Sequence, residues 1–413
     1  MLRVFLQKIL RFLSVGIIKK HQPVIIAITG SVGKTTTKEM IYSVLRGLDI
    51  FVGKSEKNYN TEIGVSLGII GLGGENRYWW QWLRVFGRAF RLLFGGKYPD
   101  VLVLEMAADK PGDIKYFCDF IPIDIGVLTN VGVSHLEKFK TKEAVFQEKS
   151  YLLKQAKKLV VFGGDNLSRD VIEKKVKCKI YSGGFKPDND LFVVDFEYSL
   201  DNGRSVTKFK IKYPKKQSEL EGFLSVWGRP YLQAMTISLL VGRYFDDDPQ
   251  KMLAVLSQIK PIKQHLNLLP GIKRSWVIDD TYNSAPDSVR EALAVIGELK
   301  GGRKIVVLGD MLELGSVEND KHREIGAMVG QCRDVIFVAV GQRMKVAIGS
   351  FKKVFSDEFK GVDLRERVHW FADANQAGKF VQDLIEEGDF ILVKGSRGMK
   401  MEKVVKEIVA FGV

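Results

Sequence analysis

The feature that most constrains the fold is a glycine-rich turn placed directly after a buried strand. Residues 24–29 (VIIAIT) form an unbroken apolar run, which is typical of a parallel strand covered on both faces. The run continues into TGSVGKTTTKEM (29–40), where glycines lead straight into a helical sequence. Backbone N–H groups of such a turn, at a helix N-terminus, form a cradle for phosphate. The pattern therefore predicts an α/β domain whose first loop binds a nucleotide.

Residue types within this turn suit the chemistry of a bound ATP with Mg²⁺. Lys34 can reach the β- and γ-phosphates, and the hydroxyl of Thr35 is a hard ligand for Mg²⁺. Ile28 stands where the longer GxxxxGK[ST] motif has its first glycine, so only the short G-x-x-G-K-T form is present. The nucleotide-binding residues predicted here are Gly30, Ser31, Val32, Gly33, Lys34, Thr35 and Thr36.

Further apolar runs repeat this strand-and-turn arrangement along both halves of the chain. They predict strands at 101–106, 124–130, 159–165, 276–283, 304–310, 334–341 and 389–396. Residues 190–227 alternate and turn like short antiparallel strands, and a helix is expected over 231–245. The predicted fold class is α/β: a central P-loop-type, doubly wound, mostly parallel sheet with a small antiparallel subregion, then a Rossmann-like C-terminal domain. The expected segments are an amphipathic N-terminal helix (1–22), an ATP-binding domain (23–262) and a C-terminal domain (263–413).

The net charge of +14 indicates an anionic partner or, alternatively, a simply solvated basic surface. No zinc finger, RNP-like run or basic tail is present, so nucleic acid is not the expected partner. The three cysteines lie far apart without CxxC spacing, which favours a reducing cytoplasm.

Two segments, 1–20 and 78–94, combine apolar and basic residues with helical spacing. The first is too short and too charged to span a membrane, and it lacks a signal-peptide cleavage site. The second places three tryptophans and three arginines on one amphipathic helix, with Gln81 and the arginines opposite the aromatic side chains. Each segment is predicted either to pack on the protein or to lie in a membrane interface, giving a peripheral contact at the inner face of the membrane.

Several longer motifs, in order, resemble those of the Mur ligase superfamily. They are TGSVGKTTT (29–37), KNYNTEIGVSL (57–67), VLEMAADKPGDI (103–114), TNVGVSHLEKF (129–139), FQEKSYLL (146–153), DDTYNSAPDS (279–288), VLGDMLELG (307–315) and KGSRGMKME (394–402). The resemblance runs from about residue 24 to the end, and the last three motifs are most similar to the branch that adds D-alanyl-D-alanine to the cell-wall peptide precursor (MurF).

That resemblance implies an ATP-dependent carboxylate–amine ligase of peptidoglycan biosynthesis. A carboxylate of an anionic peptide precursor would attack the γ-phosphate of ATP, and an amine, expected to be D-alanyl-D-alanine, would then displace phosphate from the acyl phosphate. Two Mg²⁺ ions would assist the first step. We further expect a monomeric, cytoplasmic enzyme.

The roles of further residues are implied by the same resemblance. Glu105 also ends a predicted strand, where doubly wound sheets place their ligands. The metal ligands would be Thr35, Glu105, His135 and Lys149, with Lys149 carbamylated, and the catalytic residues Lys34, His135 and Lys149. The second domain would contact the nucleotide through Asp280, Tyr282 and Asn283. Substrate contacts are expected from Asn58, Asn60, Asp310, Glu313, Lys394, Ser396 and Arg397.

Departures from the family pattern leave alternatives open. GRPY (228–231) replaces a G-x-H-N motif, His265 replaces an arginine, and Ala285 replaces an asparagine. Only about 22 residues precede the first predicted strand, so the usual N-terminal domain that holds the uridine diphosphate group is expected to be lacking. The alternatives are another superfamily ligase, of folylpolyglutamate, poly-glutamate or cyanophycin type, and a catalytically silent ATP-binding partner protein.

Overall fold

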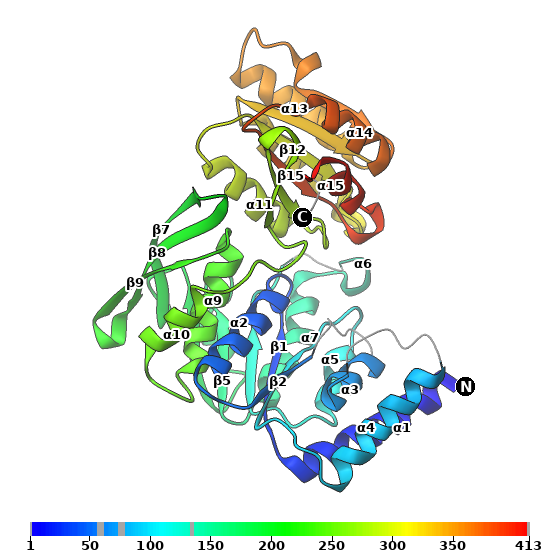
Figure 1. The fold of residues 1–413 in the computed structure, drawn as a ribbon, viewed down its shortest axis with the longest axis vertical. Coiled ribbons are helices and arrows are strands. Elements are labelled where there is room, and N and C mark those ends of the chain that lie inside the picture. The colour runs from blue at the N-terminus through cyan, green and yellow to red at the C-terminus, as the bar shows by residue number, and fades with distance from the viewer. Residues whose placement is uncertain (1, 56–61, 73–78, 133–135, 411–413) are drawn as a thin grey trace.

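Two sheets covered by helices make up the protein (Figure 1). The computed structural model describes residues 2–55, 62–72, 79–132 and 136–410. Within these residues the first sheet has nine strands. In spatial order they are β2 (Val52–Lys54), β3 (Val101–Glu105), β1 (Val24–Thr29), β4 (Ile125–Leu128), β5 (Leu159–Gly163), β6 (Lys179–Gly184), β7 (Leu191–Asp201), β8 (Arg204–Tyr213) and β9 (Ser218–Leu224). Strands β2 to β7 run parallel, whereas β8 and β9 extend the sheet in antiparallel fashion.

Alternating side chains of β1 show why this sheet is covered on both faces. Ile26 and Ile28 belong to the apolar core shared with α2, α9 and α10, while Ile25 and Ala27 belong to the core shared with α1, α3, α4, α5 and α7. The helices of this half are α1 (Leu2–His21), α2 (Lys34–Gly47), α3 (Glu62–Ile70), α4 (Trp79–Phe94), α5 (Asp113–Cys118), α6 (Leu136–Phe139), α7 (Lys142–Gln155), α8 (Arg169–Glu173), α9 (Arg229–Gly242) and α10 (Pro249–Leu256).

The second sheet has six strands in the described part of the chain. Their order is β10 (Asn267–Pro270), β11 (Trp276–Asp280), β15 (Phe390–Lys394), β12 (Lys304–Gly309), β13 (Val335–Val340) and β14 (Val368–Phe371). All neighbours are parallel except β10, which is antiparallel to β11. Its helices are α11 (Pro286–Glu298), α12 (Glu318–Gly330), α13 (Met344–Glu358), α14 (Ala374–Leu384) and α15 (Glu402–Ile408).

The α/β class and the mostly parallel first sheet confirm the predicted fold. Each strand expected from an apolar run is present. Strand β1 has the predicted bounds, and the others end one to three residues earlier than predicted. Strands β2, β6, β10 and β14 carry no such run and were missing from the prediction. The connection between the sheets lies between the end of α10 at Leu256 and the start of β10 at Asn267. The boundary proposed at 262/263 falls inside it.

Candidate active site

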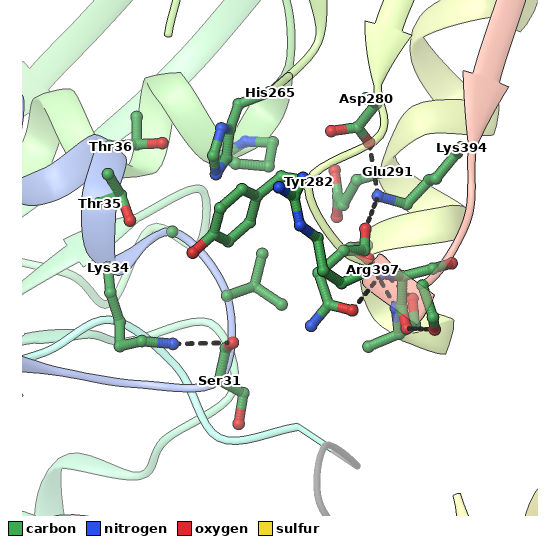
Figure 2. Close-up of a pocket in the computed structure, with 18 of the residues that line it drawn as sticks. Ser31, Lys34, Thr35, Thr36, His265, Asp280, Tyr282, Glu291, Lys394 and Arg397 are labelled. Atoms are coloured by element: carbon green, nitrogen blue, oxygen red, sulfur yellow. Dashed lines mark hydrogen bonds and ion pairs between the residues drawn. The ribbon is translucent and has the colours of Figure 1, made fainter. Parts of the chain in front are cut away.

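A cavity of about 400 Å³ lies between the two halves of the protein, at the carboxyl ends of strands from both sheets. The first half contributes the glycine loop after β1 and Glu105 at the end of β3. The second half contributes Asp280 at the end of β11, Lys394 at the end of β15 and the turns that follow. Figure 2 shows the two sets of side chains facing each other across this space. The arrangement follows from the rule that open parallel sheets bind ligands at their carboxyl edge.

Hydrogen bonds with the residues that follow β4 fix the conformation of the glycine loop. The side-chain oxygen of Asn130 accepts hydrogen bonds from the amides of Ser31 (3.1 Å) and Val32 (2.8 Å). Thr129 donates its hydroxyl proton to the carbonyl of Val32 at 2.6 Å. Gly33 then adopts a left-handed conformation (φ 81°) and starts α2. Neither Thr129 nor Asn130 was predicted as a site residue, although the T-N pair after an apolar strand carried the signal.

Replacing Gly30 by alanine should reduce kcat/KM for ATP by about 10²-fold, because the loop would have to move. A Cβ atom at this position would lie 1.9 Å from the hydroxyl oxygen of Thr129. Steady-state kinetics with varied ATP would measure the effect. Gly297→Ala in α11 is the matched control, because a Cβ atom there meets no atom within 4 Å. Unchanged kinetics in Gly30→Ala would show that the loop geometry does not limit nucleotide use.

Two of the predicted metal ligands lie together at the start of α2. The hydroxyl of Thr35 donates to the carboxylate of Glu105, with oxygen–oxygen distances of 3.1 and 3.3 Å. The buried amine of Lys38 lies 3.6 Å from the same carboxylate. A hydroxyl next to a carboxylate is a donor set that suits Mg²⁺. Among the described residues, no cluster of three or more His, Cys, Asp or Glu side chains could hold a metal ion.

Lys149 on α7 reaches the same loop. Its amine donates to the hydroxyl of Ser31 at 2.8 Å, and its side chain is buried. Burial, followed by the positive charge of Lys34, holds the pKa of Lys149 well below its ordinary value. Burial also lowers the pKa of Lys34, against the opposing carboxylates of Glu105 and Asp109. The site thus holds two neighbouring amines whose protonated forms are disfavoured.

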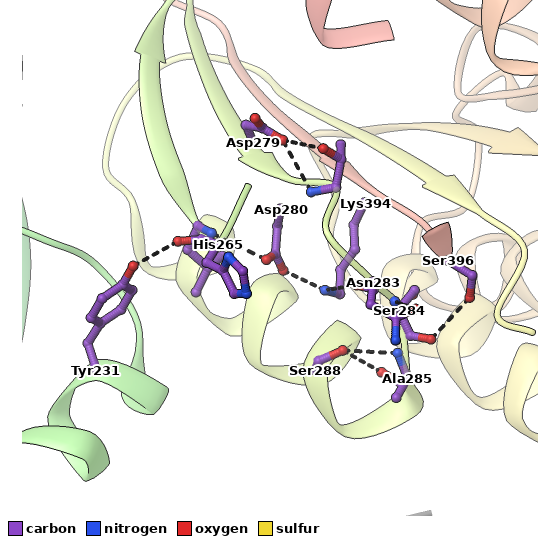
Figure 3. A network of polar contacts seen from close by, with 12 residues as sticks. Tyr231, His265, Asp279, Asp280, Asn283, Ser284, Ala285, Ser288, Lys394 and Ser396 are labelled. Atoms are coloured by element: carbon purple, nitrogen blue, oxygen red, sulfur yellow. Dashed lines mark hydrogen bonds and ion pairs between the residues drawn. The ribbon is translucent and has the colours of Figure 1, made fainter. Parts of the chain in front are cut away.

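In the second half, Asp280 and Lys394 form a buried ion pair (Figure 3). The amine of Lys394 donates to the carboxylate at 2.6 Å and to the carbonyl of Asn283 at 2.9 Å. The other carboxylate oxygen accepts from the amide of Leu266 at 3.2 Å. Both charged residues line the cavity. The interaction fixes the turn that follows β11.

A stacked aromatic pair forms part of the cavity wall, and one member, His265, is a position that departs from the family pattern. The rings of His265 and Tyr282 stack with centroids 4.7 Å apart, and both line the cavity. The hydroxyl of Tyr231 accepts from the amide of Ile262 and donates to the carbonyl of His265, each at 3.1 Å. Tyr231 therefore anchors the connection between the sheets to α9.

The remaining predicted site residues fall into three groups. Glu313, Ser396 and Arg397 line the cavity, as do the loop residues 31–36. Asp310 is not among the lining residues, because its carboxylate accepts from the amide of Met344 at 2.9 Å at the start of α13. Asn58, Asn60 and His135 lie outside the described residues.

The sequence matches two domain families. One covers the half with the glycine loop, and the other covers the half with the second sheet. Residues 28–72 and 91–235 match the Mur ligase middle domain, and residues 266–397 match the Mur ligase glutamate ligase domain. The chain belongs to the Mur ligase family and is an ATP-dependent amide ligase.

Individual relatives agree with this assignment. The UDP-N-acetylmuramoyl-tripeptide–D-alanyl-D-alanine ligase of Bacillus subtilis is 28% identical over 93% of this chain and 76% of its own length. The crystal structure of the MurF ligase from Thermotoga maritima in complex with ADP superposes with a TM-score of 0.76 at 25% identity, covering 97% of this chain and 83% of the other. A folylpolyglutamate synthase from Mycobacterium tuberculosis shares the fold, with a TM-score of 0.63 at 13% identity, covering 96% and 95% of the two chains.

Proposed function

We propose that this ligase joins D-alanyl-D-alanine to the carboxylate of a cell-wall peptide precursor. The observation that carries the proposal is the shared cavity. It combines a phosphate-binding loop from one half with the DDTYN and KGSR turns of the other half, which are most similar to the MurF branch. The named Bacillus subtilis relative, which is similar over most of the chain, supports the same substrate pair.

In the proposed reaction, residues of the first half neutralise and orient the triphosphate. The loop amides and the ammonium of Lys34 balance negative charge as the substrate carboxylate attacks the γ-phosphate. Thr35 and Glu105 would hold Mg²⁺, which supplies charge neutralisation on the phosphate oxygens when bound. The stacked rings of His265 and Tyr282 offer a flat surface for the adenine base. In the second step, the amine attacks the acyl carbon and inorganic phosphate leaves.

Carbamylation of Lys149 is a further part of the proposal, and it creates the ligand for a second Mg²⁺. The lowered pKa leaves a neutral amine, which is the form that attacks carbon dioxide. Addition of the amine to carbon dioxide gives a carbamate and releases one proton. The product is an anion next to Lys34, so it stabilises the ammonium form of that lysine.

The proposed substrates can be tested by mass spectrometry of the ligated product. The purified chain would receive ATP and Mg²⁺ with either a muramoyl-tripeptide precursor or folate. Each mixture would contain D-alanyl-D-alanine, L-glutamate or no amine. Phosphate release and a product mass that require D-alanyl-D-alanine are the expected result. Turnover with folate and L-glutamate instead would favour the folylpolyglutamate-type alternative. ATP binding without phosphate release for any amine would favour a silent partner protein.

A monomer in the cytoplasm is the proposed working state. The three cysteines, Cys118, Cys178 and Cys332, are all free thiols, which supports a reducing compartment. None of the described helices combines the length and apolarity needed to cross a bilayer.

A further inference from the structure

Helices α1 and α4 pack side by side at the end of the first half that lies away from the second sheet (Figure 1). Their last turns meet: His21 bonds the carbonyl of Leu92 at 2.8 Å, and Lys20 donates to the carbonyl of Leu93 at 2.5 Å. Each helix buries one face in the core below the sheet. The buried residues are Leu10, Leu13 and Ile17 of α1 and Val85, Ala89 and Leu92 of α4.

Both helices lie largely outside the residues that match the family model of the Mur ligase middle domain. The middle-domain match begins at residue 28, after α1, and it omits 73–90, which contains most of α4. That family model therefore does not describe the outward faces of these helices.

Those outward faces carry large apolar side chains in solvent. Among the described residues, the four most exposed large hydrophobic side chains are Phe94 (83%), Phe12 (77%), Phe5 (63%) and Leu83 (61%). All four belong to α1 or α4. Phe90 is also exposed, and with Leu83 and Phe94 it forms a stripe within about 40° of helix circumference, because these positions are seven and four residues apart. Aromatic rings held in water on two packed helices mark a surface that contacts something apolar.

The charges around this apolar stripe have one sign. Neither helix contains an acidic residue, whereas together they contain eight lysines and arginines. On α4, Arg84, Arg88 and Arg91 form a second exposed stripe about 100° from the apolar one. On α1, Lys8 and Lys19 are exposed on the side of Phe5 and Phe12. The partner must therefore offer negative charge beside an apolar layer.

We propose that α1 and α4 form a docking surface for an anionic lipid bilayer. The phenyl rings enter the boundary between headgroups and acyl chains, while the arginines and lysines contact lipid phosphates. A second copy of the chain fits poorly, because an isologous contact would bring like charges together. The surface lies away from the cavity, so a docked enzyme keeps its active site open to the cytoplasm (Figure 1).

Flotation with phospholipid vesicles tests the proposal without using the ligase activity. The full chain should float with phosphatidylcholine vesicles that contain phosphatidylglycerol, remain in solution with phosphatidylcholine alone, and dissociate as salt is added. Phe12→Ser combined with Phe94→Ser should weaken binding by roughly tenfold or more. Arg84→Glu combined with Arg91→Glu should do the same and abolish the preference for the anionic lipid.

Matched controls alter exposed residues elsewhere in the chain. Phe223→Ser on β9 and Lys352→Glu with Lys353→Glu on α13 should bind vesicles like the unaltered chain. Equal melting temperatures would show that every variant is folded. Absence of flotation of the unaltered chain, or equal flotation of the α1/α4 variants, would overturn the proposal. Dimerisation in solution that the Phe12/Phe94 variant abolishes would assign the surface to a second copy instead.

Discussion

Replacing Lys149 by alanine should lower the turnover number of the ligase by about 10³-fold while the chain stays folded. In the structure this amine donates a hydrogen bond to Ser31, and the loss of that one bond removes little stabilisation from the native state. Its proposed carbamate, in contrast, would supply an anionic ligand at the phosphate site. Steady-state phosphate release measures the loss. Lys154→Ala, an exposed lysine on the same helix, is the control and should retain full activity.

An arginine at position 149 distinguishes a carbamate on Lys149 from a simple positive charge at this position. Lys149→Arg keeps the positive charge but cannot form the carbamate, so it should be as inactive as the alanine variant. Acetate or formate should restore part of the activity of Lys149→Ala by placing a carboxylate in the vacated space. Full activity of Lys149→Arg would exclude the carbamate.

The pH dependence of carbamylation follows from the lowered pKa of Lys149. Carbon dioxide reacts with the neutral amine only, and burial with the nearby Lys34 charge keeps that form populated at lower pH than in an exposed lysine. At fixed dissolved carbon dioxide, the recovery rate of bicarbonate-depleted enzyme should rise with pH up to this lowered pKa and level off above it.

Replacing Lys394 by methionine should lower the free energy of unfolding by about 3 kcal/mol. The change leaves the carboxylate of Asp280 largely buried without its partner and removes the bond that holds the carbonyl of Asn283. Denaturant unfolding followed by circular dichroism measures the loss. Lys406→Met on α15 removes an exposed lysine from the same half and should change stability by less than about 0.5 kcal/mol.

A double variant shows whether the loss in the free energy of unfolding comes from breaking the ion pair. Asp280→Asn in the Lys394→Met background removes the stranded charge, so it should recover part of the lost stability. If the double variant is less stable than the sum of both single changes, the pair is not the unit that stabilises this turn.

Local patterns predicted the site more completely in the first half than in the second. The glycine loop, Thr35 and Glu105 could be found because apolar strands ending in polar residues reveal the carboxyl edge of a parallel sheet. The partner of Lys394 could not be predicted, because Asp280 lies 114 residues away in the sequence. Only the pairing of β11 with β15 brings the two residues together. The same limit applies to Asp310, whose carboxylate is directed to the start of α13.

The amphipathic helices show a related limit. Spacing alone predicted Trp82, Phe86, Phe90 and Phe94 on one face, opposite the arginines. In the structure, Trp82 and Phe86 pack against the core, whereas Phe90 and Phe94 face solvent. A helical period gives the angle between side chains, but the neighbouring elements decide which part of the circumference is covered.

The lowered pKa of Lys34 has a consequence for how the enzyme takes up ATP. In the free protein, burial lowers the pKa of this group. An arriving triphosphate favours the ammonium form and so raises that pKa again. At a pH near the pKa of Lys34 in the free enzyme, nucleotide binding is therefore accompanied by proton uptake from solution. Alkaline conditions weaken nucleotide binding for the same reason.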